Sequence, residues 1–418
     1  MNTVIEPSPV GLQPSHWDLL RMDFPILQRN IHGNPLVYLD NAASSQKPES
    51  VLKAIDHYYR FENANIHRGV HFLSAEATQA FEKTRDQIKE FIHARNTREI
   101  IFTKGTTDSI NLIAATFGKA FIKKGDRIMI SAMEHHSNIV PWQMVAEEKE
   151  AELIVIPMNQ EGELILEEFD HLLDSRVKII SISHLSNSLG TINPISYIIE
   201  KAHALGIPVL VDGAQSAPHI PVNVQEMDCD FFVFSGHKTL GPTGIGILYG
   251  KEEWLEKLPP YQGGGEMIKT VTFKKTTYNE LPFKFEAGTP HIAGGICLGT
   301  AIDYMQKIGL ENIHARENEL LAQATNSILE LEEIRLIGTA KNKSSVLSFL
   351  VKGVHPYDIG VLLDQQGIAV RTGHHCTQPV MDFFNIPGTV RASFSFYNNL
   401  EDIHRFISSL KKAIKMLV

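Results

Sequence analysis

The chain has 418 residues, of which 43% are hydrophobic and 21% are charged. These proportions are typical of a globular protein, exclude disordered and collagen-like classes, and at this length predict more than one hydrophobic core. With 48 Asp and Glu against 39 Lys and Arg, the net charge of -9 argues against a nucleic-acid-binding surface, which needs clustered basic residues.

The cysteine content and the N-terminus indicate the compartment. Three cysteines are too few for a disulfide framework and suit a reducing environment. Residues 1–20 contain three prolines and lack a basic region followed by an apolar one, so no signal peptide is predicted. No apolar run approaches the roughly 20 residues that a membrane-spanning helix needs. We therefore expect a cytoplasmic protein without a membrane segment.

Short β-branched runs alternate with amphipathic stretches between residues 100 and 250. Helices are expected between the strands, for example at 107–121, 142–150 and 195–204. This alternation is typical of an α/β fold with a mainly parallel sheet covered on both faces, in which ligands bind beyond the carboxyl ends of the strands. The predicted strands are 100–103, 127–131, 153–157, 177–181, 208–212, 231–234 and 245–249.

The pattern changes after the glycine-rich stretch at 261–265, which opens a region expected to be irregular as far as about residue 285. Beyond Pro290, a smaller α+β domain is predicted from helices at 291–308, 312–331 and 400–417 and strands at 346–351, 368–371 and 390–393. The chain is therefore divided into an N-terminal segment (1–30) that packs with the small domain, a large domain (31–300) and a small C-terminal domain (301–418).

Two polar groups directly follow apolar strands of the large domain. Lys238 lies in Phe234-Ser235-Gly236-His237-Lys238, where a buried amine could form a Schiff base and where Ser235 and His237 could hold a phosphate. Asp212 ends the strand before Gly213-Ala214-Gln215, where a carboxylate could pair with a pyridine nitrogen and Gln215 could donate to a ring hydroxyl. In isolation, Lys238 could be a surface lysine, and Asp212 a helix cap or a metal ligand.

Two further strand ends carry candidate ligands. The turn Gly105-Thr106-Thr107 leads into a helix, whose free N–H groups suit a phosphate, although Thr106 could serve only as an N-cap. In Glu134-His135-His136, an imidazole could stack on an aromatic cofactor and move protons. Together with His374-His375-Cys376 this cluster also suggests zinc, but it lacks the ligand spacing of zinc sites, and no metal site is predicted.

Cys376 is the candidate nucleophile of the C-terminal domain. It lies in Arg371-Thr372-Gly373-His374-His375-Cys376, where two imidazoles and an arginine would favour the thiolate. Cys229 and Cys297 lie in apolar settings and are interpreted as structural thiols. Arg391 ends another strand, and its guanidinium fits a substrate carboxylate, although a surface salt bridge is the alternative.

These motifs occur together and in one order, and the chain resembles the cysteine desulfurases of fold-type I from about residue 24 to the last helix. Within that family it is similar to the SUF-type (group II) members, whose cysteine loop carries Arg-Thr-Gly-His-His-Cys. The resemblance rests on the segments 103–107, 134–136, 186–187, 212–215, 235–238, 285–290 and 371–376.

The resemblance implies an enzyme that binds pyridoxal 5'-phosphate in the large domain, converts L-cysteine to L-alanine and takes the sulfur on Cys376 as a persulfide for iron–sulfur cluster assembly. Lys238 would carry the cofactor and His135 would stack on it and act in catalysis. The implied cofactor ligands are Thr106, Thr107, His135, Asp212, Gln215, Ser235 and His237, with Thr289 from the second subunit of a homodimer. The implied substrate residues are Asn187, Arg371, Arg391, His67 and Arg68.

A short cysteine loop cannot swing far, so a SufE-like or SufU-like sulfur-acceptor protein is expected to dock beside it. Selenocysteine lyase or cysteine-sulfinate desulfinase chemistry, with L-selenocysteine or the sulfinate as substrate, would use nearly the same residues. The alternatives from other classes are a catalytically silent sulfur-carrier scaffold and a zinc hydrolase.

Overall fold

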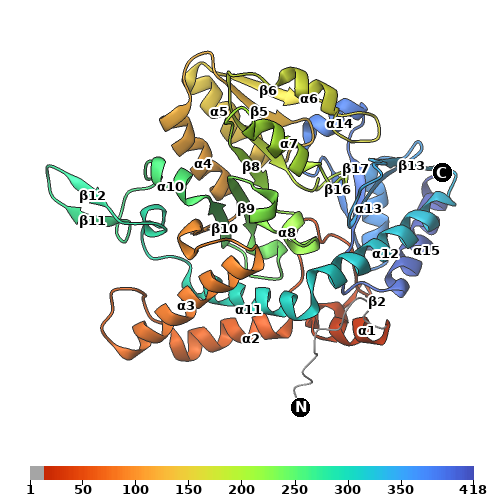
Figure 1. Cartoon of the computed structure of the whole chain (residues 1–418). Coiled ribbons are helices and arrows are strands. Elements are labelled where there is room, and N and C mark those ends of the chain that lie inside the picture. Colours follow the sequence, from red (N-terminus) through yellow and green to blue (C-terminus); the bar gives the residue numbers. More distant parts are fainter. Residues whose placement is uncertain (1–13) are drawn as a thin grey trace.

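The computed structural model describes residues 14–418, and its centre is a seven-stranded sheet of order β4-β10-β9-β8-β7-β5-β6 (Figure 1). All neighbours from β9 to β6 are parallel, and β10 is antiparallel to both β4 and β9. The predicted α/β fold with a mainly parallel sheet is confirmed. The strands are β4 (Ile100–Thr103), β5 (Arg127–Ser131), β6 (Glu152–Ile156), β7 (Val177–Ser183), β8 (Val209–Asp212), β9 (Phe231–Ser235) and β10 (Gly246–Gly250).

Helices cover both faces of this sheet, as the side chains of β9 show. Phe231 and Val233 join a core with the helices α4 and α5, whereas Phe232 and Phe234 join the core on the opposite face. Successive side chains of a strand point to opposite faces, so a strand apolar at every position must be buried on both. The covering helices include α2 (Glu49–His57), α3 (Phe72–Phe91), α4 (Thr106–Phe121), α5 (Val140–Lys149), α6 (Leu166–Leu172), α7 (Ile195–His203) and α11 (Ile292–Ile308).

The C-terminal part contains an antiparallel sheet of order β13-β14-β17-β16. Its strands are β13 (Ile334–Ile337), β14 (Val346–Val351), β16 (Arg371–Gly373) and β17 (Thr389–Ser393), and its helices are α12 (Leu310–Leu329), α13 (Pro356–Asp364), α14 (Gln378–Phe384) and α15 (Leu400–Leu417). The strand predicted at 368–371 is divided in two, because β15 (Ile368–Ala369) pairs with β3 (Val37–Tyr38) while β16 pairs with β17. Val37 and Leu39 thereby join the C-terminal core.

The N-terminal helix α1 (Pro14–Met22) lies against the C-terminal part of the chain. The rings of Trp17 and Phe396 are 6.3 Å apart, and Arg21 Nη1 is 2.9 Å from Asp402 Oδ2. Residues 1–13, on which the predicted N-terminal segment and the signal-peptide prediction partly rest, lie outside the described residues. Other short strands and α-helices are β1 (Asn30–Ile31), β2 (Asn34–Pro35), α8 (Ser216–His219), α9 (Val224–Met227) and α10 (Glu252–Lys257).

The region predicted to be irregular contains a hairpin, so that expectation is wrong in part. Strands β11 (Ile268–Val271) and β12 (Thr276–Tyr278) pair antiparallel across a turn in which Thr272 N–H donates to Lys275 O, and the hairpin projects from the body (Figure 1). Its side chains are mostly exposed, so no buried apolar face marked it in the sequence.

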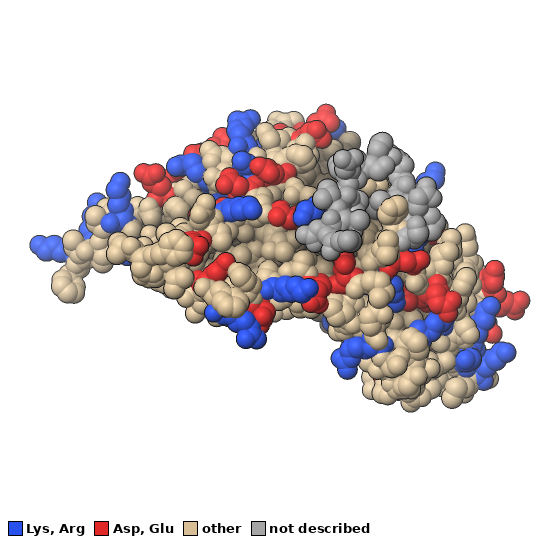
Figure 2. All heavy atoms as spheres, turned by 90° about the horizontal axis from the view of Figure 1, so that it is seen from below, with Lys and Arg blue, Asp and Glu red and all other residues tan. Residues whose placement is uncertain are grey.

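In the described part of the chain, no helix combines the length and the apolar character that crossing a membrane requires. Figure 2 shows Lys and Arg interspersed with Asp and Glu on the face seen from below, rather than a continuous basic surface. That face therefore lacks the charge pattern typical of nucleic-acid binding.

Candidate active site

A cavity of about 170 Å³ lies where the carboxyl ends of the central strands meet the C-terminal sheet. Ser183, Asp212 and Ser235 line it from the ends of β7, β8 and β9, and Arg391 lines it from β17. Most of the residues predicted from the sequence share this cavity: Thr106, Thr107, His135, Asn187, Asp212, Gln215, Ser235, His237, Lys238, Arg371, Cys376 and Arg391. Parallel strands present their carboxyl ends at one edge, which is why residues distant in sequence converge there.

Lys238 ends a one-turn helix that directly follows β9. Burial lowers the pKa of its amine from 10.5 to about 8, an effect that the Asp212 carboxylate opposes. The peptide before it is fixed, because the carbonyl of His237 accepts from Ser45 N–H at 3.1 Å and from Lys47 Nζ at 2.8 Å. The backbone that carries the amine is therefore held in place, and the amine is more readily neutral, and thus nucleophilic, than that of an exposed lysine.

Asp212 and Gln215 offer polar atoms that the protein does not fully use. Asp212 is 5% exposed and accepts a hydrogen bond from Ala214 N–H at 2.9 Å, and burial raises its carboxyl pKa. Gln215 donates from Nε2 to Ala42 O at 2.7 Å, while its buried Oε1 has no partner among the described residues. Nε2 carries a second N–H, and its donation to a ring hydroxyl stays a prediction. Buried polar groups without partners are uncommon, so Gln215 Oε1 in the wall of this cavity indicates a ligand.

The start of α4 forms the other end of the cavity. Gly105 caps this helix and has no side chain to cover the free N–H groups, so the alternative in which Thr106 is the N-cap is wrong. Thr106 N–H instead donates to Ser235 Oγ at 2.8 Å. A Cβ on Gly246 of β10 would lie 2.3 Å from Gly105 Cα, so only glycine allows this close approach. Free N–H groups, hydroxyls and the helix dipole together fit a phosphate.

His135 lines the cavity as a neutral imidazole. Burial and the nearby Lys238 lower its pKa to about 3. Its Nδ1 accepts from Ser137 N–H at 3.1 Å and lies 2.7 Å from Ser137 Oγ, so the ring proton is on Nε2. Beside it, Glu134 is fully buried and accepts from Ser183 N–H at 3.0 Å. The backbone that carries His135 is therefore fixed in the segment that follows β5.

Cys376 is half-buried, whereas Cys229 and Cys297 are buried, as the sequence predicted for structural thiols. His375, next to it, is 4% exposed, and burial together with Arg391 lowers its pKa to about 2. The expectation that two imidazole charges favour the thiolate is therefore wrong for His375, which is neutral. The positive charges near the thiol come from Arg371 and Arg391, because these residues are directly opposite in the β16–β17 pair and both line the cavity.

Arg391 is 1% exposed, so the alternative of a surface salt bridge is wrong. Its Nη2 lies 2.9 Å from Asp40 Oδ1, and Nη1 donates to Asn187 O at 2.9 Å. Nε has no partner in the described part of the chain. A guanidinium held from two sides, with one N–H free, suits a carboxylate ligand.

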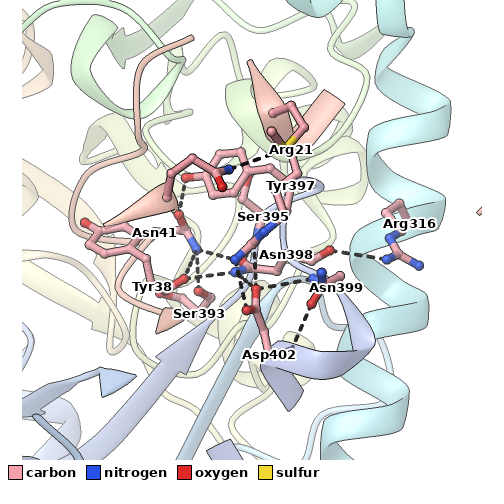
Figure 3. Close-up of polar contacts among 12 residues, drawn as sticks. Arg21, Tyr38, Asn41, Arg316, Ser393, Ser395, Tyr397, Asn398, Asn399 and Asp402 are labelled. Carbon is pink, nitrogen blue, oxygen red and sulfur yellow. Dashed lines mark hydrogen bonds and ion pairs between the residues drawn. The ribbon is translucent and has the colours of Figure 1, made fainter. Parts of the chain in front are cut away.

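Sequence reasoning missed residues 40–45, which contribute Asp40 and two cavity-lining residues, Ala42 and Ala43. This segment is held by a polar network that joins it to α1, to α12 and to residues 393–402 (Figure 3). Asn41 Nδ2 donates to Ser393 O at 2.7 Å, and Tyr397 Oη donates to Asn41 Oδ1. The segment has no motif of its own, and only its position after the apolar run 36–39 could have suggested a role.

Three predicted residues do not line the cavity of this chain. His67 Nε2 lies 3.0 Å from Glu82 Oε1, Arg68 Nε lies 2.9 Å from Glu266 Oε1, and Thr289 is exposed. Within residues 14–418, moreover, no three His, Cys, Asp or Glu side chains are grouped as a metal site requires, so the zinc alternative has no ligand set there.

The cavity residues therefore fit pyridoxal phosphate: an amine for its aldehyde, a carboxylate for its ring nitrogen and a helix start for its phosphate. Comparison with known proteins also leads to pyridoxal phosphate. The aminotransferase class-V family matches residues 37–406. A probable cysteine desulfurase of Halalkalibacterium halodurans is 51% identical over 93% of this chain and 96% of its own length.

Two other proteins extend this comparison. A cysteine desulfurase of Synechococcus elongatus is 50% identical over 94% of this chain, which spans 63% of that relative's length. The solved apo structure of the cysteine desulfurase from Thermococcus onnurineus has a TM-score of 0.92 at 39% identity and covers 98% of this chain and 100% of its own. The chain therefore belongs to the cysteine desulfurases of the class-V aminotransferase family, whose cofactor is pyridoxal phosphate.

Proposed function

We propose that this protein converts L-cysteine to L-alanine and transfers the sulfur to Cys376 as a persulfide for delivery to an acceptor protein in iron–sulfur cluster assembly. The observation that carries the proposal is that Cys376 and Lys238, both half-buried, line the same cavity. An aminotransferase would need the lysine but has no evident use for the thiol. A sulfur-carrier scaffold would need the thiol but not a lysine whose pKa is lowered to about 8.

When bound, pyridoxal phosphate supplies an electron-poor ring that stabilises negative charge on the carbon beside the substrate amine. The chain would hold it through Lys238 and Asp212, with the start of α4 and Ser235 at the phosphate. A carboxylate that remains charged beside the ring nitrogen keeps the ring electron-poor, and the bound ring cation would offset the effect of burial on Asp212.

The residues of this chain then have distinct tasks. Arg391 and Asn187 orient the substrate carboxylate. The freed amine of Lys238 removes the proton from the substrate Cα, and His135, with its proton on Nε2, can donate a hydrogen bond inside the cavity. The thiolate of Cys376 attacks the substrate sulfur: an S–S bond forms, the Cβ–S bond breaks, and Cβ gains a proton. L-Cysteine and the thiol thus give L-alanine and a persulfide without an external oxidant.

The test is to replace Cys376 by alanine in the cofactor-loaded protein. We expect L-cysteine still to shift the visible absorption of the cofactor, while alanine formation falls on the order of a thousandfold, because the group that receives the sulfur is absent. Mass spectrometry of the wild type should find one extra sulfur atom on the peptide that contains Cys376.

The matched control is Cys229→Ala, which removes a buried thiol that does not line the cavity. This variant should form alanine at the wild-type rate. Undiminished alanine formation by Cys376→Ala would instead refute the role of Cys376 as the sulfur acceptor.

We further infer that the working unit is a homodimer. His67, Arg68 and Thr289 lie outside the cavity of their own chain, which leaves them available to the cavity of a second copy. The chain also exposes large apolar side chains close together in sequence, which is typical of a protein–protein interface: Tyr59, Phe61, Val70, Phe72 and Leu73. Sedimentation of the purified protein as a monomer at micromolar concentration would contradict this inference.

A further inference from the structure

His136 is not used by the proposed mechanism and does not line the cavity, yet it contacts the nucleophile loop twice. Its backbone N–H donates to the carbonyl of Cys376 at 2.8 Å. Its ring Nε2 accepts from the backbone N–H of Gln378 at 3.1 Å. Because Thr377 lies between these two contacts, His136 holds the chain on both sides of it.

The loop needs such contacts because its backbone is strained. His375 and Cys376 have φ values of 53° and 58°, which place two consecutive non-glycine residues in the left-handed region. This conformation is disfavoured for L-residues and persists only where surrounding contacts impose it. A loop freed from those contacts would relax, and the Sγ of Cys376 would move with it.

Other contacts hold the same loop. Thr377 N–H and Oγ1 both donate to His374 O, at 2.9 and 2.8 Å, and close the turn around Cys376, whereas two further contacts act before Cys376. Asn187 Nδ2 donates to His375 O at 2.7 Å, and His375 Nε2 lies 2.8 Å from Thr389 Oγ1. Asn187 also lines the cavity, so its substitution would disturb substrate binding as well. The contacts of His136 lie at Cys376 and after it, and can be tested separately.

His136 is itself anchored. Glu134, two residues earlier, is 0% exposed and accepts from Ser183 Oγ at 2.6 Å and from Asn138 Nδ2 at 2.7 Å. These bonds join the segment after β5 to the end of β7. The segment 134–136 therefore has a buried anchor at Glu134, a cavity-lining ring at His135 and two contacts to the nucleophile loop at His136.

We propose that His136 is a positioning residue for sulfur transfer. Its two hydrogen bonds connect the loop of Cys376 to the central sheet and so keep the thiol oriented toward the substrate sulfur. This inference rests on the proposed function, because it assigns a role in the step that forms the persulfide. It does not concern binding of L-cysteine.

The experiment compares His136→Phe with His136→Gln in the full-length, cofactor-loaded protein. Phe keeps the backbone N–H and a planar ring but has no acceptor, whereas the Gln side chain can present an amide oxygen to the N–H of Gln378. We expect His136→Phe to show an unchanged cofactor band shift with L-cysteine, but persulfide formation on Cys376 slowed roughly tenfold or more in a single turnover. His136→Gln should recover most of that rate.

A second readout requires no turnover. Without L-cysteine, iodoacetamide should alkylate Cys376 severalfold faster in His136→Phe than in the wild type or in His136→Gln, because the freed loop exposes the thiol. The matched control is His404→Phe on the exposed side of α15, which should leave both rates unchanged. If His136→Phe does not fold, His136→Ala replaces it in the comparison.

Wild-type rates of persulfide formation and alkylation in His136→Phe or His136→Ala would overturn the proposal. Equal loss in Phe and Gln variants would also overturn it, because the acceptor atom would then be irrelevant. If the wild type itself forms no persulfide, the proposed function fails, and the alkylation rates still decide whether His136 holds the loop.

Discussion

The two ends of the cavity are built in different ways. At the cofactor end, Asp212 and Lys238 directly follow β8 and β9, which lie side by side within the central sheet and are buried along their length. Thr106 begins a helix of 16 residues that packs on the same sheet. Local structure and the sheet beneath it therefore fix these groups.

At the nucleophile end, Cys376 follows β16, an edge strand of the smaller sheet, and its φ of 58° is unfavourable. Contacts with the other half of the chain, from Asn187 and His136, hold this loop. The comparison indicates that cofactor binding is a property of one rigid sheet, whereas sulfur transfer depends on how two sheets meet. Loss of Lys238 at the first end should abolish every partial reaction, whereas substitution of Cys376 or His136 at the second should affect sulfur transfer alone.

The largest effect is expected at the cofactor end from Lys238→Ala. Without the amine that removes the Cα proton, alanine formation should fall by roughly a thousandfold or more, and the visible Schiff-base band of the cofactor should disappear. The matched control is Lys343→Ala, because burial also lowers the pKa of Lys343 to about 8 but this residue does not line the cavity. Retention of full turnover by Lys238→Ala would contradict both the role of Lys238 and the comparison.

A smaller effect is expected from Gly246→Ala, which tests the rigidity of the cofactor end. The added Cβ would lie 2.3 Å from Gly105 Cα, so the phosphate-binding turn must shift, at a cost of about 1–3 kcal/mol in unfolding free energy or cofactor affinity. Urea unfolding measures the unfolding free energy, and cofactor titration measures the affinity for the cofactor. Gly263→Ala, where an added Cβ meets nothing within 4 Å, is the control. Equal behaviour of the two variants would show that the turn is flexible.

The smallest effect concerns pH. Because the Lys238 amine has a pKa of about 8 instead of 10.5, it is mostly neutral, and thus reactive towards an aldehyde, above pH 8 and mostly protonated below it. The rate at which cofactor-free protein gains the visible band on adding pyridoxal phosphate should rise about threefold between roughly pH 7.5 and 8.5 and then level off. A rate that continues to rise to roughly pH 10 would mean that Lys238 behaves as an exposed lysine.

Strong local patterns made the cofactor end predictable. A short run that is apolar at every position, such as 231–234, favours a strand buried on both faces, and in a parallel sheet the carboxyl end of such a strand faces the ligand. Position and residue type therefore made Lys238 and Asp212 candidates, and the other motifs of the chain decided between the alternatives that each residue alone left open. The hairpin β11–β12 could not, because its exposed strands lack the burial pattern on which such predictions rest.

By itself, then, the sequence determined the α/β architecture, the strands that end at the cavity and the residue types that suit pyridoxal phosphate, since these follow from periodicity and local chemistry. Only the tertiary structure decided that Arg391 pairs with Asp40, 351 residues away, and that His375 is a neutral imidazole. It also decided that His136 forms hydrogen bonds with Cys376 and Gln378 of the nucleophile loop. The physical reason is that burial, pKa and hydrogen-bond partners depend on which distant segments pack together, and one-dimensional spacing carries no record of that packing.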